Sequence, residues 1–404
     1  MVALRLLHLA DVHLGVESYG RFDPATGLNS RLLDFTARLD EAVDCAIDEQ
    51  VDLVVFAGDA YKSRDPSPTQ QREFARRVRR LSDAGIPTFL LVGNHDLPAA
   101  SGRANSLDIF DTLAVPNVHV GRSLSTHRVE TKAGPVQIVA LPWLRRSALL
   151  ALPDYRQMSA DQMRRAIQDL AARFVEDAAS QLDPSLPAIL TAHVSVDGAT
   201  YGSERSVLVG EDIVLSRSSI ALDRFDYVAL GHIHKHQVLS EDPPVVYAGS
   251  LERIDFGEES DPKGFVLATI EDGRTTWRFR QVAARPFVTI RARPVGVAPT
   301  QEIVDQIEKA SLDGAVVRLI VETTPEVDAF VDYAAVRRAL RGAYCIAGVR
   351  RDVARADRRG GRVSGVEQLT PVDALEHYLA AKEVAAERRK RLVEYAQQLI
   401  GEPS

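Results

Sequence analysis

Polar residues of the kinds that bind metal ions follow five apolar segments of this sequence. The clearest is the run TFLLV at residues 88–92, which is followed by Gly93, Asn94, His95 and Asp96. Such residues often only form a turn, but in α/β sheets ligands gather beyond the carboxyl ends of the strands. We therefore group the polar ends of all five segments as one candidate site: Asp11, His13, Asp59, Asn94, His95, Asp96, His193, His232 and His234.

These side chains have the chemistry of a centre with two divalent ions. The i, i+2 spacing of Asp11 and His13 places both on one side of a chain leaving a strand, which suits a single cation. Two ions about 3.5 to 4 Å apart can clamp the attacking and leaving oxygens of a phosphoryl displacement and supply hydroxide near neutral pH. A bridging carboxylate is needed to hold two ions at such a short distance. The net positive charge that remains at the site attracts a phosphodiester. Mixed imidazole, carboxylate and amide ligands favour Mn, Fe or Zn over Ca or Mg.

The segments that carry these residues alternate with helix-patterned segments. Strand-like residues 3–10, 51–57 and 88–92 are separated by helix-like residues 28–49 and 66–84. This order predicts an α/β fold with a parallel, doubly wound sheet. We expect a short helix at 106–113, a long amphipathic helix capped by Ser159 with Gln162 at its third position, and strands near 118 and 129 and at 136–141, 188–192, 225–230 and 245–248.

The composition indicates a globular protein with more than one domain. A chain of 404 residues corresponds to two or three domains of about 150 residues each. No apolar run approaches the ~20 residues that span a bilayer, and Asp11 interrupts the apolar N-terminus, so we expect a cytoplasmic protein without a signal peptide. The net charge of −7 argues against a surface coated with nucleic-acid-binding charge. Cys45 and Cys345 are expected to be buried free thiols.

The ordered set Asp11-x-His13, Gly58-Asp59, Gly93–Asp96, His193 and Gly231-His232-x-His234 resembles the calcineurin-like metallophosphoesterase superfamily. Two longer stretches, LHLADVHLG at 7–15 and YAGSLERIDFGEE at 247–259 with KGF at 263–265, resemble more narrowly the SbcD-like nuclease subunits. This resemblance covers residues 1–285 and implies metallophosphoesterase sheets flanked by helices. It also implies a metal-dependent DNA exonuclease or endonuclease that processes double-strand breaks with an SbcC-like ATPase of the SMC family.

The resemblance assigns a role to each site residue. Asp11, His13, Asp59 and His234 would hold one ion, while Asp59, Asn94, His193 and His232 would hold the second, with Asp59 as the bridge. Mn²⁺ is the favoured metal. His95 would act on the scissile phosphate as a catalytic residue, and Asp96 would orient His95 or cap the next helix. Lys62, where relatives often have His or Asp, and Arg103 are candidate substrate contacts.

The remainder of the chain predicts further domains beyond a phosphoesterase domain at residues 1–284. Residues 285–351 read as a small α/β capping domain, with strands at 286–292, 316–322 and 344–350 and helices at 300–310 and 331–341. Residues 352–369 read as a basic linker, and residues 370–404 as an amphipathic helix that binds the ATPase. A single helix from residue 372 to 400 would be about 44 Å long. The resemblance further implies a homodimer within a heterotetramer, DNA as a partner and no membrane.

Two other functions fit part of these observations. A phosphomonoesterase or cyclic-nucleotide phosphodiesterase of the same superfamily would use the same metal ligands, but gives no reason for the capping domain and terminal helix. A degenerate phosphoesterase that serves as a protein-binding scaffold would not need an intact ligand at all seven positions: Asp11, His13, Asp59, Asn94, His193, His232 and His234.

Overall fold

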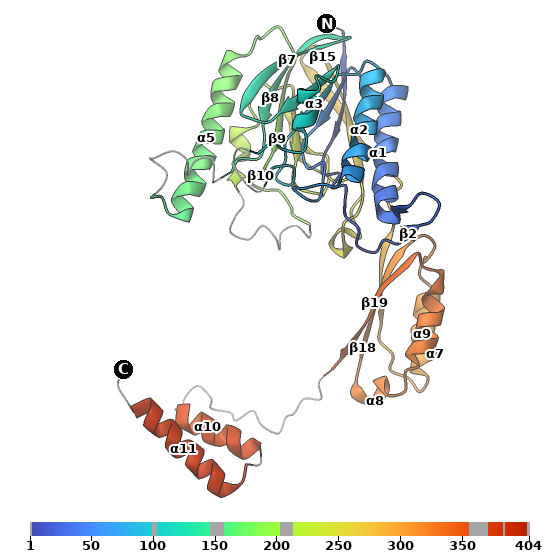
Figure 1. Ribbon diagram of the computed structural model, residues 1–404, viewed down its shortest axis with the longest axis vertical. Helices are drawn as coiled ribbons and strands as arrows, with labels where there is room; N and C mark the ends of the chain where they lie inside the picture. Colours follow the sequence, from blue (N-terminus) through green and yellow to red (C-terminus); the bar gives the residue numbers. More distant parts are fainter. Residues whose placement is uncertain are drawn as a thin grey trace.

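The computed structural model describes residues 2–98, 103–145, 157–202, 213–354, 371–382 and 384–401. Two six-stranded sheets form the larger part of the molecule, which we name the two-sheet unit (residues 2–284). In Figure 1 helices α1 and α2 lie on one side of the sheets and α5 on the other. A three-stranded unit (residues 285–354) and a pair of C-terminal helices follow.

The first sheet has four parallel strands and an antiparallel pair at one edge. Its order is β16-β15-β1-β4-β5-β6, and β15 pairs antiparallel with both β1 and β16. Residues on β1 alternate between two apolar clusters, so the strand is buried on both faces and reads as a continuous apolar run. The strands are β1 (Leu4–Leu9), β4 (Leu53–Phe56), β5 (Thr88–Leu91), β6 (Val118–Gly121), β15 (Gly264–Glu271) and β16 (Arg274–Gln281).

The second sheet has the order β13-β14-β12-β9-β8-β7. Its central strands β14, β12, β9 and β8 are parallel, and both edge strands are antiparallel. One apolar cluster takes residues from both sheets, including Leu6 and Val55 of the first and Ile189 and Ala229 of the second, so the sheets pack face to face. The strands are β7 (Ser125–Thr131), β8 (Gly134–Leu141), β9 (Ala188–His193), β12 (Tyr227–Gly231), β13 (Gln237–Glu241) and β14 (Pro244–Tyr247).

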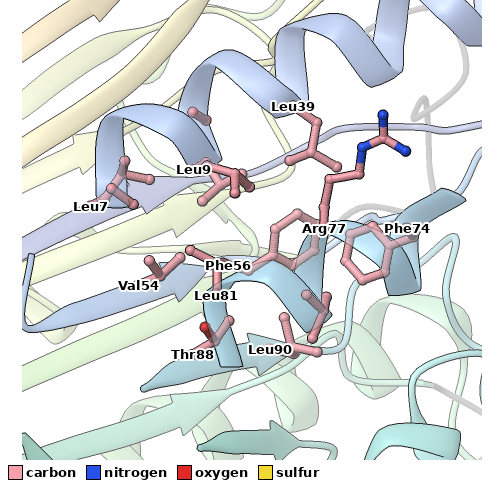
Figure 2. Close-up of a pocket in the computed structure, with 14 residues that line it drawn as sticks. Leu7, Leu9, Leu39, Val54, Phe56, Phe74, Arg77, Leu81, Thr88 and Leu90 are labelled. Atoms are coloured by element: carbon pink, nitrogen blue, oxygen red, sulfur yellow. The ribbon is translucent and has the colours of Figure 1, made fainter. Parts of the chain in front are cut away.

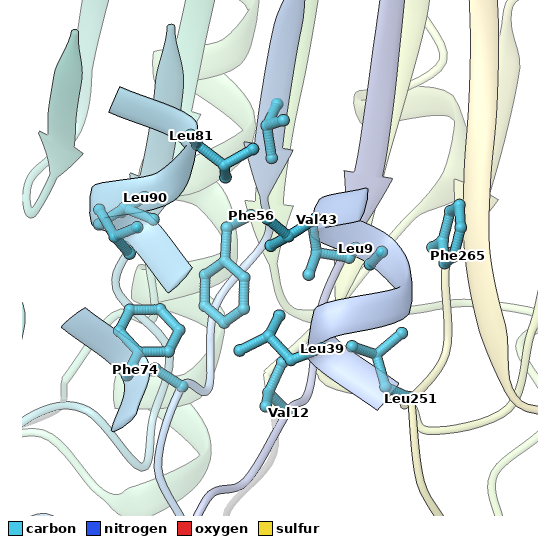
Figure 3. Close-up of a cluster of buried hydrophobic side chains, with 14 of the residues drawn as sticks. Leu9, Val12, Leu39, Val43, Phe56, Phe74, Leu81, Leu90, Leu251 and Phe265 are labelled. Carbon is cyan, nitrogen blue, oxygen red and sulfur yellow. The ribbon is translucent and has the colours of Figure 1, made fainter. Parts of the chain in front are cut away.

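Helices cover the outer face of each sheet. Figure 3 shows the cluster between the first sheet and α1 (Ser30–Asp48) and α2 (Pro68–Asp83), with Phe56 and Phe74 among its side chains. The second sheet is covered by α5 (Ala160–Gln181), and the predicted Ser159 cap with Gln162 is confirmed as a capping box. The predicted short helix is α3 (Asp108–Thr112). The α/β class with parallel sheets flanked by helices is confirmed, but a second sheet takes the place of the inner helix layer of a doubly wound fold.

The cavity in Figure 2 lies between the first sheet and helices α1 and α2. Leu7, Leu9, Val54, Phe56 and other mostly apolar side chains of the sheet, α1 and α2 line it. Its volume of about 20 Å³ is close to the space that one water needs. We interpret it as a packing void in the core, because it contains none of the candidate site residues.

The three-stranded unit is a parallel sheet with helices on one face; its alternating strands and helices were predicted, but the parallel pairing was not. Strands β17 (Phe287–Ala292), β18 (Val316–Thr323) and β19 (Cys345–Val353) pack against α7 (Pro299–Glu308) and α9 (Tyr333–Ala339). A one-turn helix α8 (Pro325–Asp328) follows β18 and was not predicted. Cys345 lies half-buried on β19 and Cys45 is buried in α1, and both are free thiols.

The C-terminal region corrects one expectation. Instead of a single helix, α10 (Pro371–Ala381) and α11 (Ala386–Gly401) pack against each other. In Figure 1 this pair lies apart from the two other units. Leu379 is buried in the pair, and two short helices that fold back on each other can cover apolar residues that one straight helix would expose. Thr370 and most of the predicted basic linker lie outside the described residues.

In the described part of the chain, no helix has the length and apolar character needed to cross a membrane.

Candidate metal centre

Both sheets deliver candidate ligands from the carboxyl ends of parallel strands. In the first sheet, Asp11 and His13 follow β1, Asp59 follows β4 and Asn94 follows β5. In the second sheet, His193 ends β9, and His232 and His234 follow β12. Because the two sheets pack face to face, these ends meet at one rim. The structure therefore brings all seven predicted ligands together.

The first group of ligands is formed by Asp11, His13 and His234, whose ligand atoms lie within 4.8 Å of one another. The Nε2 atoms of His13 and His234 are 3.0 Å apart. His13 Nε2 is also 3.6 Å from Oδ2 of Asp59. Burial lowers the pKa of His13 well below its usual value, which favours the neutral imidazole that metal ions bind.

The second group contains His193, Asn94 and His232. His193 Nε2 lies 3.0 Å from Asn94 Oδ1, and His232 Nδ1 lies 3.2 Å from the same oxygen. His193 Nε2 is 3.3 Å from Oδ2 of Asp59. One carboxylate oxygen of Asp59 therefore faces both groups, which is the position that a bridging ligand needs.

These separations fit metal ligands. Two ligand atoms each about 2.1 Å from one ion lie roughly 3.0 to 3.4 Å apart at tetrahedral or octahedral angles. The measured contacts within the groups, from 3.0 to 3.6 Å, are close to that range. Divalent ions bound there would supply Lewis-acid stabilisation of phosphoryl oxygens and lower the pKa of an attacking water.

Asp59 and His193 shift each other's pKa. Burial by itself would raise the pKa of Asp59, but the His193 imidazole, which also bonds to it, holds that pKa well below its usual value. Conversely, burial would lower the pKa of His193, but Asp59 and Asp11 raise it to about 9. The pKa of Asp11 is raised by burial. Buried positive charge is thus favoured beside Asp59.

Four ligands adopt an unusual backbone conformation. Asp11, His13, Asp59 and His232 have φ values of 52°, 48°, 61° and 98°. Residues other than glycine seldom take positive φ, and such strain collects at functional sites. The strain is maintained by bonds between the strand ends, such as the Asp11 amide to the Gly58 carbonyl at 3.0 Å.

The glycines before the ligands are required by close packing. A Cβ atom on Gly58 would lie 2.3 Å from Nδ1 of His193, and one on Gly93 would lie 2.2 Å from Oδ1 of Asp59. A Cβ on Gly231 would lie 2.2 Å from the Ala57 carbonyl oxygen. Each Gly-ligand dipeptide therefore lets another strand end approach the centre.

Asp96 has a different role from the one predicted. It neither orients His95 nor caps the next helix; its buried carboxylate accepts hydrogen bonds from the backbone amides of Asp59, Ala60 and Gly93 at 2.9, 2.9 and 3.0 Å. Burial and the nearby Asp59 raise the pKa of Asp96 to about 7. These bonds were not predicted because the Asp59 and Ala60 amides are distant from Asp96 in the sequence.

His95 lies next to the first group. Its ring centroid is 4.9 Å from that of His13, and its Nδ1 donates to the Lys62 carbonyl at 2.9 Å, leaving Nε2 for another partner. Its backbone amide donates to Asp59 Oδ1 at 2.8 Å. Ligand atoms of His95, His13 and Asp59 also lie within 4.8 Å of one another, so the geometry permits either a catalytic role or a ligand role.

The two predicted substrate contacts differ in position. Lys62 contacts the site through its backbone carbonyl, which sequence reasoning had not anticipated, while its side chain is exposed. Arg103 is exposed as well, and the described hydrogen bonds and ion pairs do not connect it with the site.

Sequence reasoning did not identify two buried charged residues beside His234. Glu258 and Lys263 are both fully buried and form an ion pair at 2.8 Å. Burial would raise the pKa of Glu258, but Lys263 and His234 lower it to about 2. Glu258 lies in the stretch YAGSLERIDFGEE and Lys263 in the stretch KGF quoted above, where a buried role for charged residues could not be seen from spacing.

Comparison with known proteins agrees with this centre. Residues 4–236, more than half of the chain, match the family model described as calcineurin-like phosphoesterase. The chain therefore belongs to the calcineurin-like phosphoesterase family, whose members are hydrolases that act on phosphoesters with a dimetal site.

Two of the solved structures to which this chain is similar are a phosphatase and an anchor protein. A dimetal phosphatase from Danio rerio is 13% identical and aligns over 69% of this chain and 96% of its own, with a TM-score of 0.39. GAP50, the anchor in the inner membrane complex of Plasmodium, is 13% identical and aligns over 70% of this chain and 85% of its own, with a TM-score of 0.36.

Proposed function

We propose that this protein is a metal-dependent DNA nuclease subunit of the SbcD type, which hydrolyses phosphodiesters in double-strand-break processing together with an SbcC-like ATPase. The observation that carries the proposal is that the three-stranded unit contacts the two-sheet unit beside the metal centre. Phe256 and Glu259 of the SbcD-like stretch make these contacts, to Phe287 and Thr289. A simple phosphomonoesterase gives no reason for a second unit at this position.

The chain's own residues divide the chemistry among them. The seven ligands would hold two ions, for which their mixture of imidazole, carboxylate and amide groups favours Mn²⁺ over Mg²⁺. His95, oriented by the Lys62 carbonyl, would stabilise charge on the scissile phosphate or protonate the leaving oxygen. Lys62 would place its exposed ammonium near a neighbouring phosphate.

The three-stranded unit offers a basic surface for DNA. Arg291, Ile320 and Arg350 are register partners on neighbouring strands, so they share one face of the sheet. Arg291 and Arg350 are exposed, while Glu322 and Asp352 form ion pairs with them and neutralise part of the charge. Arg351 instead pairs with Asp328, so it has a structural partner. We infer weak DNA binding by the isolated chain.

Two apolar surfaces support protein partners. On the helical pair, Tyr378 and Tyr395 are 60% and 65% exposed, which suits packing against the coiled coil of an SbcC-like ATPase. Between α2 and α3, a groove is lined by apolar side chains such as Ile109 and Leu113, which are 48% and 67% exposed, and by charged residues of α2 that include Arg76 and Arg79. We propose that this groove forms part of a homodimer contact within a heterotetramer. We also propose that the protein is located in the cytoplasm.

Purified protein with Mn²⁺ should therefore degrade end-labelled duplex DNA, and an SbcC-like ATPase with ATP should stimulate the reaction. The same preparation should be assayed with p-nitrophenyl phosphate and cyclic nucleotides. Faster turnover of these small substrates, without cleavage of DNA, would favour the rival phosphomonoesterase or cyclic-nucleotide phosphodiesterase. Failure to hydrolyse any phosphoester while binding a protein partner would favour a scaffold.

A further inference from the structure

A buried charged pair next to the metal centre has no role in the functions described so far. Glu258 and Lys263 lie in residues 252–263, which we name the coupling segment, and both are fully buried. Burial of an ion pair costs desolvation energy that the attraction between the charges often does not recover. The presence of this buried ion pair is therefore not explained by a gain in folding stability.

The inner side of the coupling segment holds the metal ligand His234. Glu258 Oε1 accepts a hydrogen bond from His234 Nδ1 at 2.8 Å, which directs the opposite nitrogen, Nε2, toward His13. Lys263 Nζ donates to the His234 carbonyl at 3.1 Å and to the Ser250 hydroxyl at 2.9 Å. The ring and the backbone of one ligand are thus fixed by two opposite charges.

The outer side of the same segment carries the three-stranded unit. The Glu259 carboxylate accepts hydrogen bonds from the backbone amide and the hydroxyl of Thr289, the first at 2.7 Å. The Phe256 ring lies 5.0 Å from the ring of Phe287. The Arg318 guanidinium lies 4.2 Å above the Phe256 ring and also donates to the Thr289 hydroxyl at 2.9 Å.

These inner and outer contacts are one residue apart. Phe256–Glu258 form a single 3-10 turn that Asp255 caps through a 2.7 Å bond to the Gly257 amide. Arg253 also fastens the segment, because its guanidinium donates to the carbonyls of Glu258 and Asp261 at 3.2 and 2.9 Å. These bonds tie the turn to the rest of the coupling segment, so a short stretch of bonded backbone links the inner and outer contacts.

We propose that Glu258 is a positioning residue for His234 and that the docking of the three-stranded unit on Phe256 and Glu259 sets its position. The affinity of the ion held by His13 and His234 then depends on contacts made in another unit of the protein. Movement of the three-stranded unit, for example when a substrate or partner binds it, changes occupancy of this ion. The inference requires the family's metal centre but does not require DNA as the substrate.

The inner half of the proposal is tested by titrating Mn²⁺ into the metal-free protein in a calorimeter. Replacing a partner of a ligating histidine typically weakens metal binding about 10- to 100-fold, so Glu258→Gln should weaken one ion by this amount and leave the other within about twofold. Since this change leaves Lys263 buried without its partner, the double variant Glu258→Gln with Lys263→Met should be measured as well. If both ions keep their affinity in both variants, or both ions are weakened equally, Glu258 does not position His234.

The outer half is tested by changes that do not touch a ligand. Thr289→Val and Glu259→Gln should weaken the same ion by between about twofold and thirtyfold, the range expected for mutations along a coupling network. Thr323→Val, the same substitution elsewhere in the three-stranded unit, is the matched control and should have no effect. The electron paramagnetic resonance spectrum of bound Mn²⁺ should change in both test variants and not in the control. Unchanged affinity and spectrum in folded Thr289→Val and Glu259→Gln would overturn the coupling.

Discussion

The carboxylate of Asp96 holds the backbone of Asp59, the residue that faces both groups of ligands. The Asp96 carboxylate accepts a hydrogen bond from the Asp59 amide at 2.9 Å, while the Asp59 side chain is directed at the centre. Asp59 has a strained φ of 61°, so this bond stabilises a conformation that the chain would otherwise avoid. Asp96 therefore acts on the metal centre through the backbone.

Asp96→Asn should weaken metal binding without unfolding the protein. The asparagine keeps the shape of the side chain, but its amide group turns donor hydrogens toward backbone amides that need an acceptor. We expect about a 10- to 100-fold loss of metal affinity, measured by calorimetry with Mn²⁺. Asp197→Asn, at an exposed position, is the control. Wild-type affinity in Asp96→Asn would exclude a role for these bonds.

Asp59→Ala should abolish binding of both ions together with activity. The carboxylate faces both groups, so neither ion keeps a complete set of ligands, whereas the sheets lose no apolar contact. Elemental analysis should find no stoichiometric metal, and circular dichroism should match that of the metal-free wild type. Two ions bound per chain in the variant would contradict the bridging role.

His95→Ala distinguishes catalysis from metal binding. If His95 acts on the phosphate, the variant should retain two ions but react at least about a hundredfold more slowly, as expected for the loss of one general acid or preorganised charge. Metal content and the rate of phosphodiester hydrolysis should be measured on the same preparation. Loss of one ion would instead identify His95 as a ligand, which its proximity to His13 and Asp59 permits.

DNA binding by the isolated chain should be weak and depend little on salt. The protein has a net charge of −7, and acidic neighbours neutralise part of the basic face of the three-stranded unit. Each phosphate neutralised adds roughly 0.9 to the slope of log affinity against log salt, so a slope of only a few is expected from fluorescence anisotropy. Tight binding at physiological salt would show that no partner is needed for affinity.

Removal of the helical pair should separate catalysis from assembly. A chain that ends before residue 370 keeps the metal centre and the three-stranded unit, so we expect its Mn²⁺-dependent hydrolysis to be unchanged within about twofold, because no described ligand lies in the deleted part. Co-purification with an SbcC-like ATPase and stimulation by ATP should be lost. Retained association, or an unfolded product, would show that α10 and α11 do not form the partner site.

The sequence predicted which residues meet at the rim of the two sheets, because each one is attached to a local signal. Apolar strands that end in a ligand, often after glycine, can be recognised within a few residues, as at Gly58-Asp59 and Gly93-Asn94. The capping box at Ser159 is local in the same way. Even so, the reason for the glycines became clear only from contacts such as that between Gly58 and His193.

Features that depend on distant contacts were not predictable in the same way. Strand and helix order does not show whether helices or a second sheet cover an apolar face, so the doubly wound arrangement was expected. The role of Asp96 depends on backbone amides 36 and 37 positions away. The break between α10 and α11 has no proline or glycine to announce it, because the packing of the helices on each other produces it.

The origin of the ligands in two different sheets has a consequence for how the protein folds and binds its ions. Asp11, His13, Asp59 and Asn94 come from one sheet, and His193, His232 and His234 come from the other, so a complete centre exists only after the sheets have joined. His8 of β1 helps to align them through bonds to the Tyr227 hydroxyl and the Leu230 carbonyl of β12 at 3.0 and 3.2 Å. Ions that bind the joined state and not the unfolded chain raise its stability by mass action. Metal binding thus holds the two sheets together. Chelation should lower the unfolding midpoint as the concentration of free ions falls.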